Sequence, residues 1–212
     1  MRHIQKGPPP GQLVQWRQEG LVFDFLPDRR LLREKLLAEQ HRLCAYTMRR
    51  IGSDNSHIEH IVPQSQDPER ALDWNNMVAC DESSHYGAHY KKDERVFLSG
   101  EANFLSPLNP SCESRLQYHR DGQVAGTDDV ADKTIRRLNL NHTDLQTDRR
   151  VAFETAGLVP KRGSRPGKPL MKTPLEARRF AQKVIDPNQG ELPPFCQALF
   201  QVAGQRAAQG GV

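Results

Sequence analysis

The chain has 212 residues, enough for one domain or for one domain with a helical appendage. Its 30 Lys and Arg against 26 Asp and Glu give a formal charge of +4, which favours a polyanionic partner but is too small to identify one. No apolar run is long enough for a membrane span, the segment after Met1 lacks a signal peptide's apolar stretch, and the cysteines are scattered. These features exclude a membrane-spanning protein and a disulfide scaffold, and predict a reduced, cytoplasmic protein.

Leucine spacing predicts an amphipathic helix over residues 28–43. Four leucines would face inward and four cations outward: Leu32, Leu36, Leu37 and Leu43 against Arg29, Arg30, Arg33 and Lys35. We interpret the cations as a solvated face, with contacts to phosphates as the alternative.

The next segments predict a strand, a loop and a helix. Residues 56–62 (SHIEHIV) predict a short strand that ends at Pro63, because proline cannot continue a ladder of hydrogen bonds. Asp67-Pro68 opens one helical turn, and residues 73–79 lead to Cys80. Residues 85–97 predict a helix, because His89, Lys92 and Val96 recur at helical spacing. This order is the layout of a ββα-metal finger.

Glu59 and His60, followed by Asn76 and then His89, give the residue order of an HNH nuclease. Hydrolysis of a phosphodiester requires a base that deprotonates water and a positive charge that stabilises the transition state. A neutral histidine can act as the base, and a divalent cation held by a carboxylate and a second histidine can supply the charge. An asparagine fits as the group that orients the base.

The rest of the chain predicts a hairpin and helices. Residues 115–125 form the expected hairpin, with Asp121-Gly122 as a two-residue turn. Helices are expected at 128–138, 143–156, 173–185 and 193–207, and the basic segment 161–172 has the composition of a linker. The expected fold class is therefore α+β, mainly helical, with the finger as its core and the β-hairpin after it.

The first half of the chain resembles the HNH endonuclease family of bacterial anti-phage systems, in particular the Septu subunit PtuB and the nuclease encoded beside some retrons. The resemblance implies an HNH nuclease domain with an N-terminal arm and helix over residues 1–156, and leaves 157–212 as the basic linker and C-terminal helices. The motifs that carry it are Lys6-Gly7, residues 31–44 (LLREKLLAEQHRLC), Ala45-Tyr46, residues 58–63 and 74–80, Pro107-Leu108-Asn109-Pro110, residues 118–123 and residues 138–141.

Carried over to this sequence, the resemblance implies a role for each site residue. His60 would be the general base, Asn76 would orient it, Glu59 would bind or support a metal ion, and His89 would complete the site. His85 is the alternative to His89, and His57 is a spare imidazole nearby. Lys91 and Lys92 are the expected contacts to nucleic acid. The ion would be Mg²⁺ or Mn²⁺.

The resemblance also implies partners. The substrate would be nucleic acid, either DNA or an RNA such as tRNA, and the neighbour a PtuA-like ATPase of the ABC or SMC type. A retron reverse transcriptase with its RNA and DNA product would join some complexes. The chain has no GxxxxGK[ST] motif, so nucleotide sensing would belong to the partner. The rival reading is a catalytically decayed finger that binds nucleic acid or docks on such a complex.

One departure from the family concerns zinc. Many relatives carry two cysteine pairs that form a tetrahedral zinc site. Here Thr47 stands where the partner of Cys44 is expected. Ser83, Ala88 or Tyr90 stands where the partner of Cys80 is expected. Two cysteines do not form a structural zinc site, so we predict none. Packing would hold the finger instead, with Trp74, Tyr46, Phe97 and the two cysteines in the core.

Overall fold

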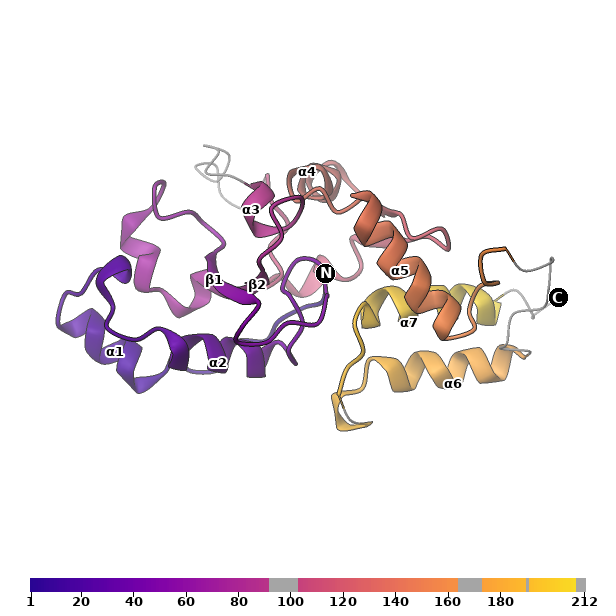
Figure 1. Ribbon diagram of the computed structural model, residues 1–212, viewed down its shortest axis with the longest axis horizontal. Helices are drawn as coiled ribbons and strands as arrows, with labels where there is room; N and C mark the ends of the chain where they lie inside the picture. The colour runs from indigo at the N-terminus through magenta and orange to yellow at the C-terminus, as the bar shows by residue number, and fades with distance from the viewer. Residues whose placement is uncertain (92–102, 164–172, 190, 209–212) are drawn as a thin grey trace.

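The computed structural model describes residues 1–91, 103–163, 173–189 and 191–208. The molecule is elongated, with the N-terminal helices and first sheet at one end and the C-terminal helices at the other (Figure 1). Small sheets and many helices confirm the α+β class. None of the helices in these ranges is long and apolar enough to cross a membrane.

The N-terminal segment packs along one side of the first sheet. Helix α1 (Gly11–Gln18), which the sequence reasoning left within an arm, buries Leu13 and Trp16. Helix α2 (Arg30–Glu39) is the predicted amphipathic helix, shorter than expected but with its inward-facing leucines buried. It ends early because the backbone turns left-handed at His41 and Arg42, with φ of +52° and +55°. The side chain of Gln40 bonds the backbone N–H and carbonyl of Ala79.

The first sheet pairs β1 (Ser56–His60) with β2 (Met77–Asp81) in antiparallel register, from Ser56 opposite Asp81 to His60 opposite Met77. A loop that contains the predicted proline-initiated turn, Pro68–Leu72, joins the strands. Helix α3 (Ala88–Lys91) follows β2. The order of strand, loop, strand and helix matches the predicted order of elements, and that this unit, called the finger below, binds a metal ion stays a prediction. The rest of the predicted helix, with Phe97, lies outside the described residues.

The second sheet is the predicted hairpin, β3 (Leu116–Tyr118) and β4 (Val124–Gly126). Its turn is one residue longer than predicted, because His119 and Gln123 still bond and three residues separate them. Helices α4 (Asp129–Arg137) and α5 (Thr143–Thr155) follow close to the predicted bounds. The ring of His142 caps α5 by accepting from the N–H of Asp144.

The C-terminal helices pack on the second sheet. Helix α6 (Pro174–Val184) begins with a capping box of Thr173 and Glu176, and α7 (Cys196–Ala208) lies against α6, β3 and α5. Gln201 on α7 accepts from the N–H of Tyr118 at 2.9 Å and donates to the carbonyl of Leu116 at 2.8 Å. The core runs without a break from the N-terminal helices into this pair, so it marks no boundary at residue 156.

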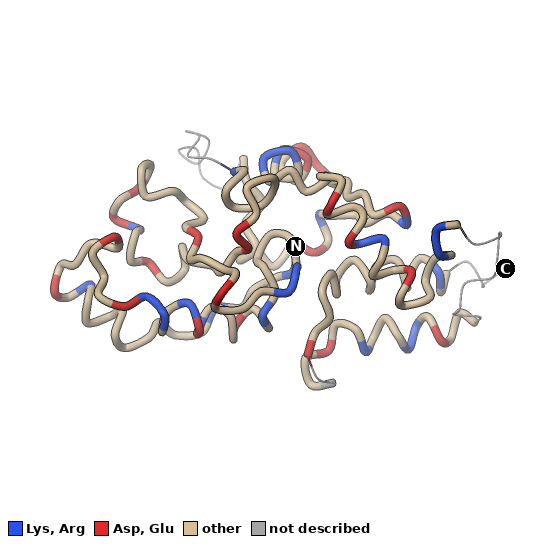
Figure 2. Tube along the Cα trace, viewed as in Figure 1, with Lys and Arg blue, Asp and Glu red and all other residues tan. Residues whose placement is uncertain are grey.

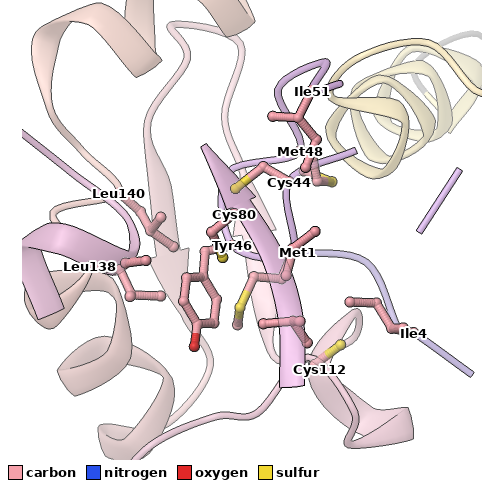
Figure 3. Packing of buried hydrophobic residues seen from close by; sticks show 14 of the residues in the cluster. Met1, Ile4, Cys44, Tyr46, Met48, Ile51, Cys80, Cys112, Leu138 and Leu140 are labelled. Carbon is pink, nitrogen blue, oxygen red and sulfur yellow. The ribbon is translucent and has the colours of Figure 1, made fainter. Parts of the chain in front are cut away.

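The centre of the molecule is closely packed around the N-terminal residue. Met1 is fully buried, and Figure 3 shows it beside Tyr46 and Cys80. Tyr46, Trp74 and the two finger cysteines are all buried, as predicted. Positively and negatively charged residues are interspersed along the described trace (Figure 2). The small excess of positive charge is therefore not concentrated in one part of the described chain.

Candidate active site

A cleft of about 260 Å³ lies where the end of β1 meets α3. Strand β1 contributes Glu59 and His60 to its walls, and α3 contributes Ala88 and Lys91. Phe23, from the segment before α2, covers another side. The remaining lining residues are Ile58, Pro63 and Gln64. Three of the predicted site residues, Glu59, His60 and Lys91, thus share one cleft.

A backbone carbonyl orients the ring of His60. His60 is the last residue of β1 and is 7% exposed, and its Nε2 lies 2.9 Å from the carbonyl oxygen of Ala71. A carbonyl oxygen can only accept, so Nε2 carries the proton of the neutral ring and Nδ1 keeps its lone pair. The environment therefore selects one tautomer, with Nδ1 as the proton acceptor.

Burial favours the neutral form of His60. The ring of Phe23 packs edge-on against it, with the ring centroids 4.5 Å apart. Burial lowers the pKa of His60 from its ordinary value of 6.5; the bond to Ala71 opposes this shift, and the nearby charge of Lys91 adds to it. Neutral imidazole is the form that can take a proton from water.

The sequence analysis expected Asn76 to orient the ring of His60, but Asn76 does not bond that ring. Its buried side chain accepts from the N–H of Val62 at 2.8 Å and donates to the carbonyls of Val62 at 2.9 Å and Arg70 at 3.2 Å. It therefore fastens both ends of the loop between β1 and β2. Because Arg70 precedes Ala71, the same amide fixes the carbonyl that orients His60. Asn76 is thus a positioning residue.

Glu59 forms a buried ion pair with Lys91. The ammonium contacts Oε1 of Glu59, and the two side chains are 14% and 4% exposed. The hydroxyl of Tyr46 donates to the same oxygen at 3.4 Å. Burial raises the pKa of Glu59, and the charge and hydrogen bond of Lys91 oppose that rise. Glu59 also lines the cleft, so its carboxylate is the group that a cation in the cleft could use.

Lys91 is not the surface contact to nucleic acid that the sequence suggested. Besides Glu59, its ammonium donates to the carbonyls of His60 at 2.6 Å and Ile61 at 3.1 Å. These bonds brace the end of β1 against α3, and a phosphate could reach Lys91 only from within the cleft. The companion residue, Lys92, lies outside the described residues.

His89 lies on α3 but bonds a different carboxylate. Its Nε2 is 3.1 Å from Oε2 of Glu82, and its ring is 4.4 Å from the ring of His57, centroid to centroid. Within the described ranges, His57, Glu82 and His89 form one of two groups of three possible metal ligands, and Glu59 belongs to neither. The structure therefore does not gather Glu59 and His89 around one point with a third ligand.

His85 lies in the other group, with His142 and Asp144. Its ring is 5.6 Å from that of His142, whose Nδ1 accepts from the N–H of Asp144 at the start of α5. None of these three residues lines the cleft. Between the two alternatives, His89 is better placed because it shares α3 with Lys91.

The residues at the positions of the relatives' zinc ligands are buried in the core, and one of them forms a buried hydrogen bond. Cys44 and Cys80 are both free and buried, and Figure 3 shows them in the packed centre. Thr47, which stands where the partner of Cys44 would be, donates to Asp81 at 2.7 Å. Burial raises the pKa of Cys80, which keeps it a thiol, a poor metal ligand. The absence of structural zinc stays a prediction.

Sequence reasoning missed three contributors. Phe23 lies far from His60 along the chain and belongs to no motif. Ala71 acts through its backbone carbonyl, so its residue type carries no signal. Glu82 could have been found from the pairing of the strands. Cys80 lies opposite His57, and Glu82, two residues after Cys80, is on the same face of the chain as long as it stays extended.

Comparison with known proteins gives one informative match. No family model matches the chain. The chain is 27% identical, over 150 residues, to the Retron Vc95 putative HNH endonuclease of Vibrio cholerae serotype O1 biovar El Tor; the match covers 65% of this chain and 70% of that protein. It confirms the resemblance to the retron-associated type, while the likeness to the Septu subunit stays a prediction.

Proposed function

The chain is related to the HNH endonucleases of the retron-associated type, and we propose that it is a metal-dependent endonuclease that hydrolyses phosphodiester bonds of nucleic acid. The observation that carries this proposal is the state of His60. Burial lowers the pKa of its ring and so favours the neutral form, the Ala71 carbonyl selects one tautomer, and the ring lies in a cleft beside a carboxylate.

The mechanism follows from this geometry. With Nε2 bonded to the carbonyl of Ala71, Nδ1 of His60 takes the proton of the attacking water. The imidazolium that forms is stabilised by the same carbonyl. Phe23 limits the access of solvent to the ring, which keeps the base neutral until a substrate is bound.

Glu59 and His89 would hold the divalent ion, which we propose to be Mg²⁺ or Mn²⁺. The carboxylate of Glu59 lines the cleft and suits such a cation. The imidazole of His89 is the second donor that the resemblance implies, and it would have to turn from Glu82, which it bonds in this structure. A bound ion would neutralise charge on the phosphate in the transition state. Lys91, already fixed beside Glu59, adds a positive charge to the same wall.

We further propose that the protein acts in the cytoplasm as the effector subunit of an anti-phage complex. The partner would be a PtuA-like ATPase, with a retron reverse transcriptase and its nucleic acid in a retron-type assembly. The retron in the relative's name supports the second setting. Both DNA and an RNA such as tRNA remain candidate substrates, because a ββα finger contacts mainly the phosphate backbone.

The test is cleavage of supercoiled plasmid and of total tRNA by the purified chain, with Mg²⁺, Mn²⁺ or EDTA, alone and with its neighbouring ATPase. We expect metal-dependent cleavage that falls by a factor of about 10³ in His60→Ala, the range that loss of a general base produces. His119→Ala is the matched control, since His119 is an exposed histidine of the second hairpin.

The outcomes separate the proposals. Equal cleavage by wild type and His60→Ala would assign the activity to a contaminant or another site. No cleavage under any condition, with the chain folded and its partner present, would overturn the endonuclease and support the decayed binding or docking subunit. Cleavage of only one nucleic acid would identify the substrate.

A further inference from the structure

We propose that His57, Glu82 and His89 bind a divalent transition-metal ion at a site separate from the Glu59 carboxylate. The three residues come from three elements: His57 from β1, Glu82 from the segment after β2, and His89 from α3. An ion held by them would fasten α3 to the end of the first sheet. Because the proposed catalytic ion also uses His89, the two ions would exclude each other at this imidazole. This inference goes beyond the proposed hydrolysis, and its test does not use cleavage.

The ligand atoms already have the spacing of a coordination sphere. Oε2 of Glu82 is 3.1 Å from Nε2 of His89 and 3.4 Å from Nδ1 of His57, and the three atoms lie within 4.8 Å of one another. Ligands about 2.0 to 2.1 Å from a tetrahedral zinc ion lie about 3.3 Å from each other. Small rotations of exposed side chains would therefore complete the site.

A polar atom without a hydrogen bond points to a ligand here. Nδ1 of His57 is excluded from solvent and makes no hydrogen bond within the described structure, although it lies beside Glu82. Buried nitrogen atoms in proteins are normally bonded, and an unpaired one indicates an ion or water at that position. The other two side chains are about half exposed, so an ion has a path to the site.

The donor set selects the class of ion. Two imidazole nitrogens and one carboxylate suit Zn²⁺, Mn²⁺, Co²⁺ or Ni²⁺, whereas Mg²⁺ prefers oxygen ligands. Three protein ligands leave at least one coordination position open. The second group, around His85, is a weaker candidate because Nδ1 of His142 already caps α5.

An ion at this site would do part of what the zinc site of two cysteine pairs does in relatives. Helix α3 is a short element within the described residues, and Lys91 on it must stay beside Glu59. Fixing His89 to the sheet would fix Lys91 two residues later. Binding should therefore raise the melting temperature of the protein, because the ion binds only the folded arrangement.

The test is calorimetric titration of the chelator-treated, full-length chain with Zn²⁺, Mn²⁺ and Mg²⁺, with no nucleic acid present. We expect a 1:1 complex with Zn²⁺, weaker binding of Mn²⁺ and no comparable binding of Mg²⁺. His57→Ala and Glu82→Gln should each weaken Zn²⁺ binding by about 100-fold or more and abolish the rise in melting temperature. His119→Ala controls for loss of any histidine, and Glu82→Gln, isosteric and exposed, should fold.

Glu59→Gln distinguishes this site from the ion proposed for catalysis. It should leave Zn²⁺ binding within a few fold. Binding lost in Glu59→Gln but kept in His57→Ala and Glu82→Gln would overturn the inference, as would unchanged affinity in the latter two variants. His60→Ala should bind Zn²⁺ normally. A chain that binds Zn²⁺ without cutting nucleic acid would sink the proposed function and leave this site standing.

Discussion

The molecule contains two units of similar plan, and the candidate active site lies in the first of them. In each, two antiparallel strands are followed by a helix: β1, β2 and α3 in the finger, and β3, β4 and α4 in the hairpin unit (Figure 1). Each is fastened by an asparagine that bonds both backbone groups of one valine. Asn76 does this for Val62, and Asn141 does it for Val124.

The two units differ in what their polar groups are bonded to. In the hairpin unit, the buried guanidinium of Arg149 donates to the carbonyls of Gly122 and Leu140, at 2.6 Å each, and so joins three segments. In the finger, the buried ammonium of Lys91 pairs with a carboxylate that lines the cleft. A buried cation stabilises the fold in both units, but only the finger leaves groups available for a substrate.

The largest expected effect comes from breaking the buried pair. Lys91→Met leaves the Glu59 carboxylate without its cation, and we expect a loss of about 3 to 5 kcal/mol in the free energy of unfolding at pH 8, measured by chemical denaturation. Lys133→Met is the control, because its pair with Asp129 lies on the surface of α4 and should be worth about 0.5 kcal/mol.

The same variant should show a characteristic pH dependence. The native pKa of Glu59 is raised above its ordinary 4.5, so the native state holds the proton more tightly and stability falls as pH rises from 4.5 through the native pKa. Removing Lys91 raises that pKa further. The deficit of Lys91→Met should therefore shrink on acidification from pH 8 to pH 5, and an equal deficit at both would contradict a buried carboxylate.

The next effect tests the tight turn of the hairpin unit. Gly122 has a φ of +95°, and an added Cβ would lie 2.1 Å from the carbonyl oxygen of Gln146. We expect Gly122→Ala to cost about 3 kcal/mol in unfolding free energy, without lowering nuclease activity per folded molecule.

The matched control for this turn is Gly163→Ala. Gly163 also has a positive φ, +76°, but nothing lies within 4 Å of an added Cβ. Its cost should be about 1 kcal/mol, the backbone term alone. Equal costs at both glycines would show that the contact with Gln146 yields easily.

Asn76 and Asn141 allow the orientation of His60 to be tested separately from the stability of the fold. Asn76→Ala and Asn141→Ala each remove both bonds to one valine, so each should cost about 2 kcal/mol in unfolding free energy. Only Asn76→Ala should also reduce cleavage, by about 100-fold, because the loop carrying the Ala71 carbonyl would lose its tie. A similar loss of activity in both variants would mean that activity merely follows stability.

The sequence predicted most of what depends on local signals. Leucine spacing located α2, Asp121-Gly122 located the hairpin, and the order of Glu59, His60 and His89 located the strand and helix of the cleft. These features depend on periodicity, turn chemistry and motif order, which act over a few residues. The helix in the N-terminal arm was missed because its apolar residues are few.

What the sequence could not supply was the partner of each polar group. The atom that orients His60 is a backbone carbonyl, and Lys91 looks like a surface lysine until α3 is placed against β1. The direction of His89 toward Glu82 likewise depends on a contact between α3 and the segment after β2. Such contacts depend on tertiary packing, which a single sequence does not specify.

The smallest expected effect concerns the charge state of His60. Burial lowers its pKa from 6.5, so the unfolded chain binds a proton more readily than the native chain as pH falls below 6.5, and this histidine makes stability decline on acidification. In cleavage assays at saturating metal, the acid limb should have its midpoint below pH 6.5, because only neutral His60 can act as the base. His60→Gln should flatten the pH dependence of stability near that limb, whereas His119→Gln in the hairpin unit should preserve it. A midpoint above 6.5 would mean that another group is the base, or that Phe23 does not shield the ring as the structure indicates.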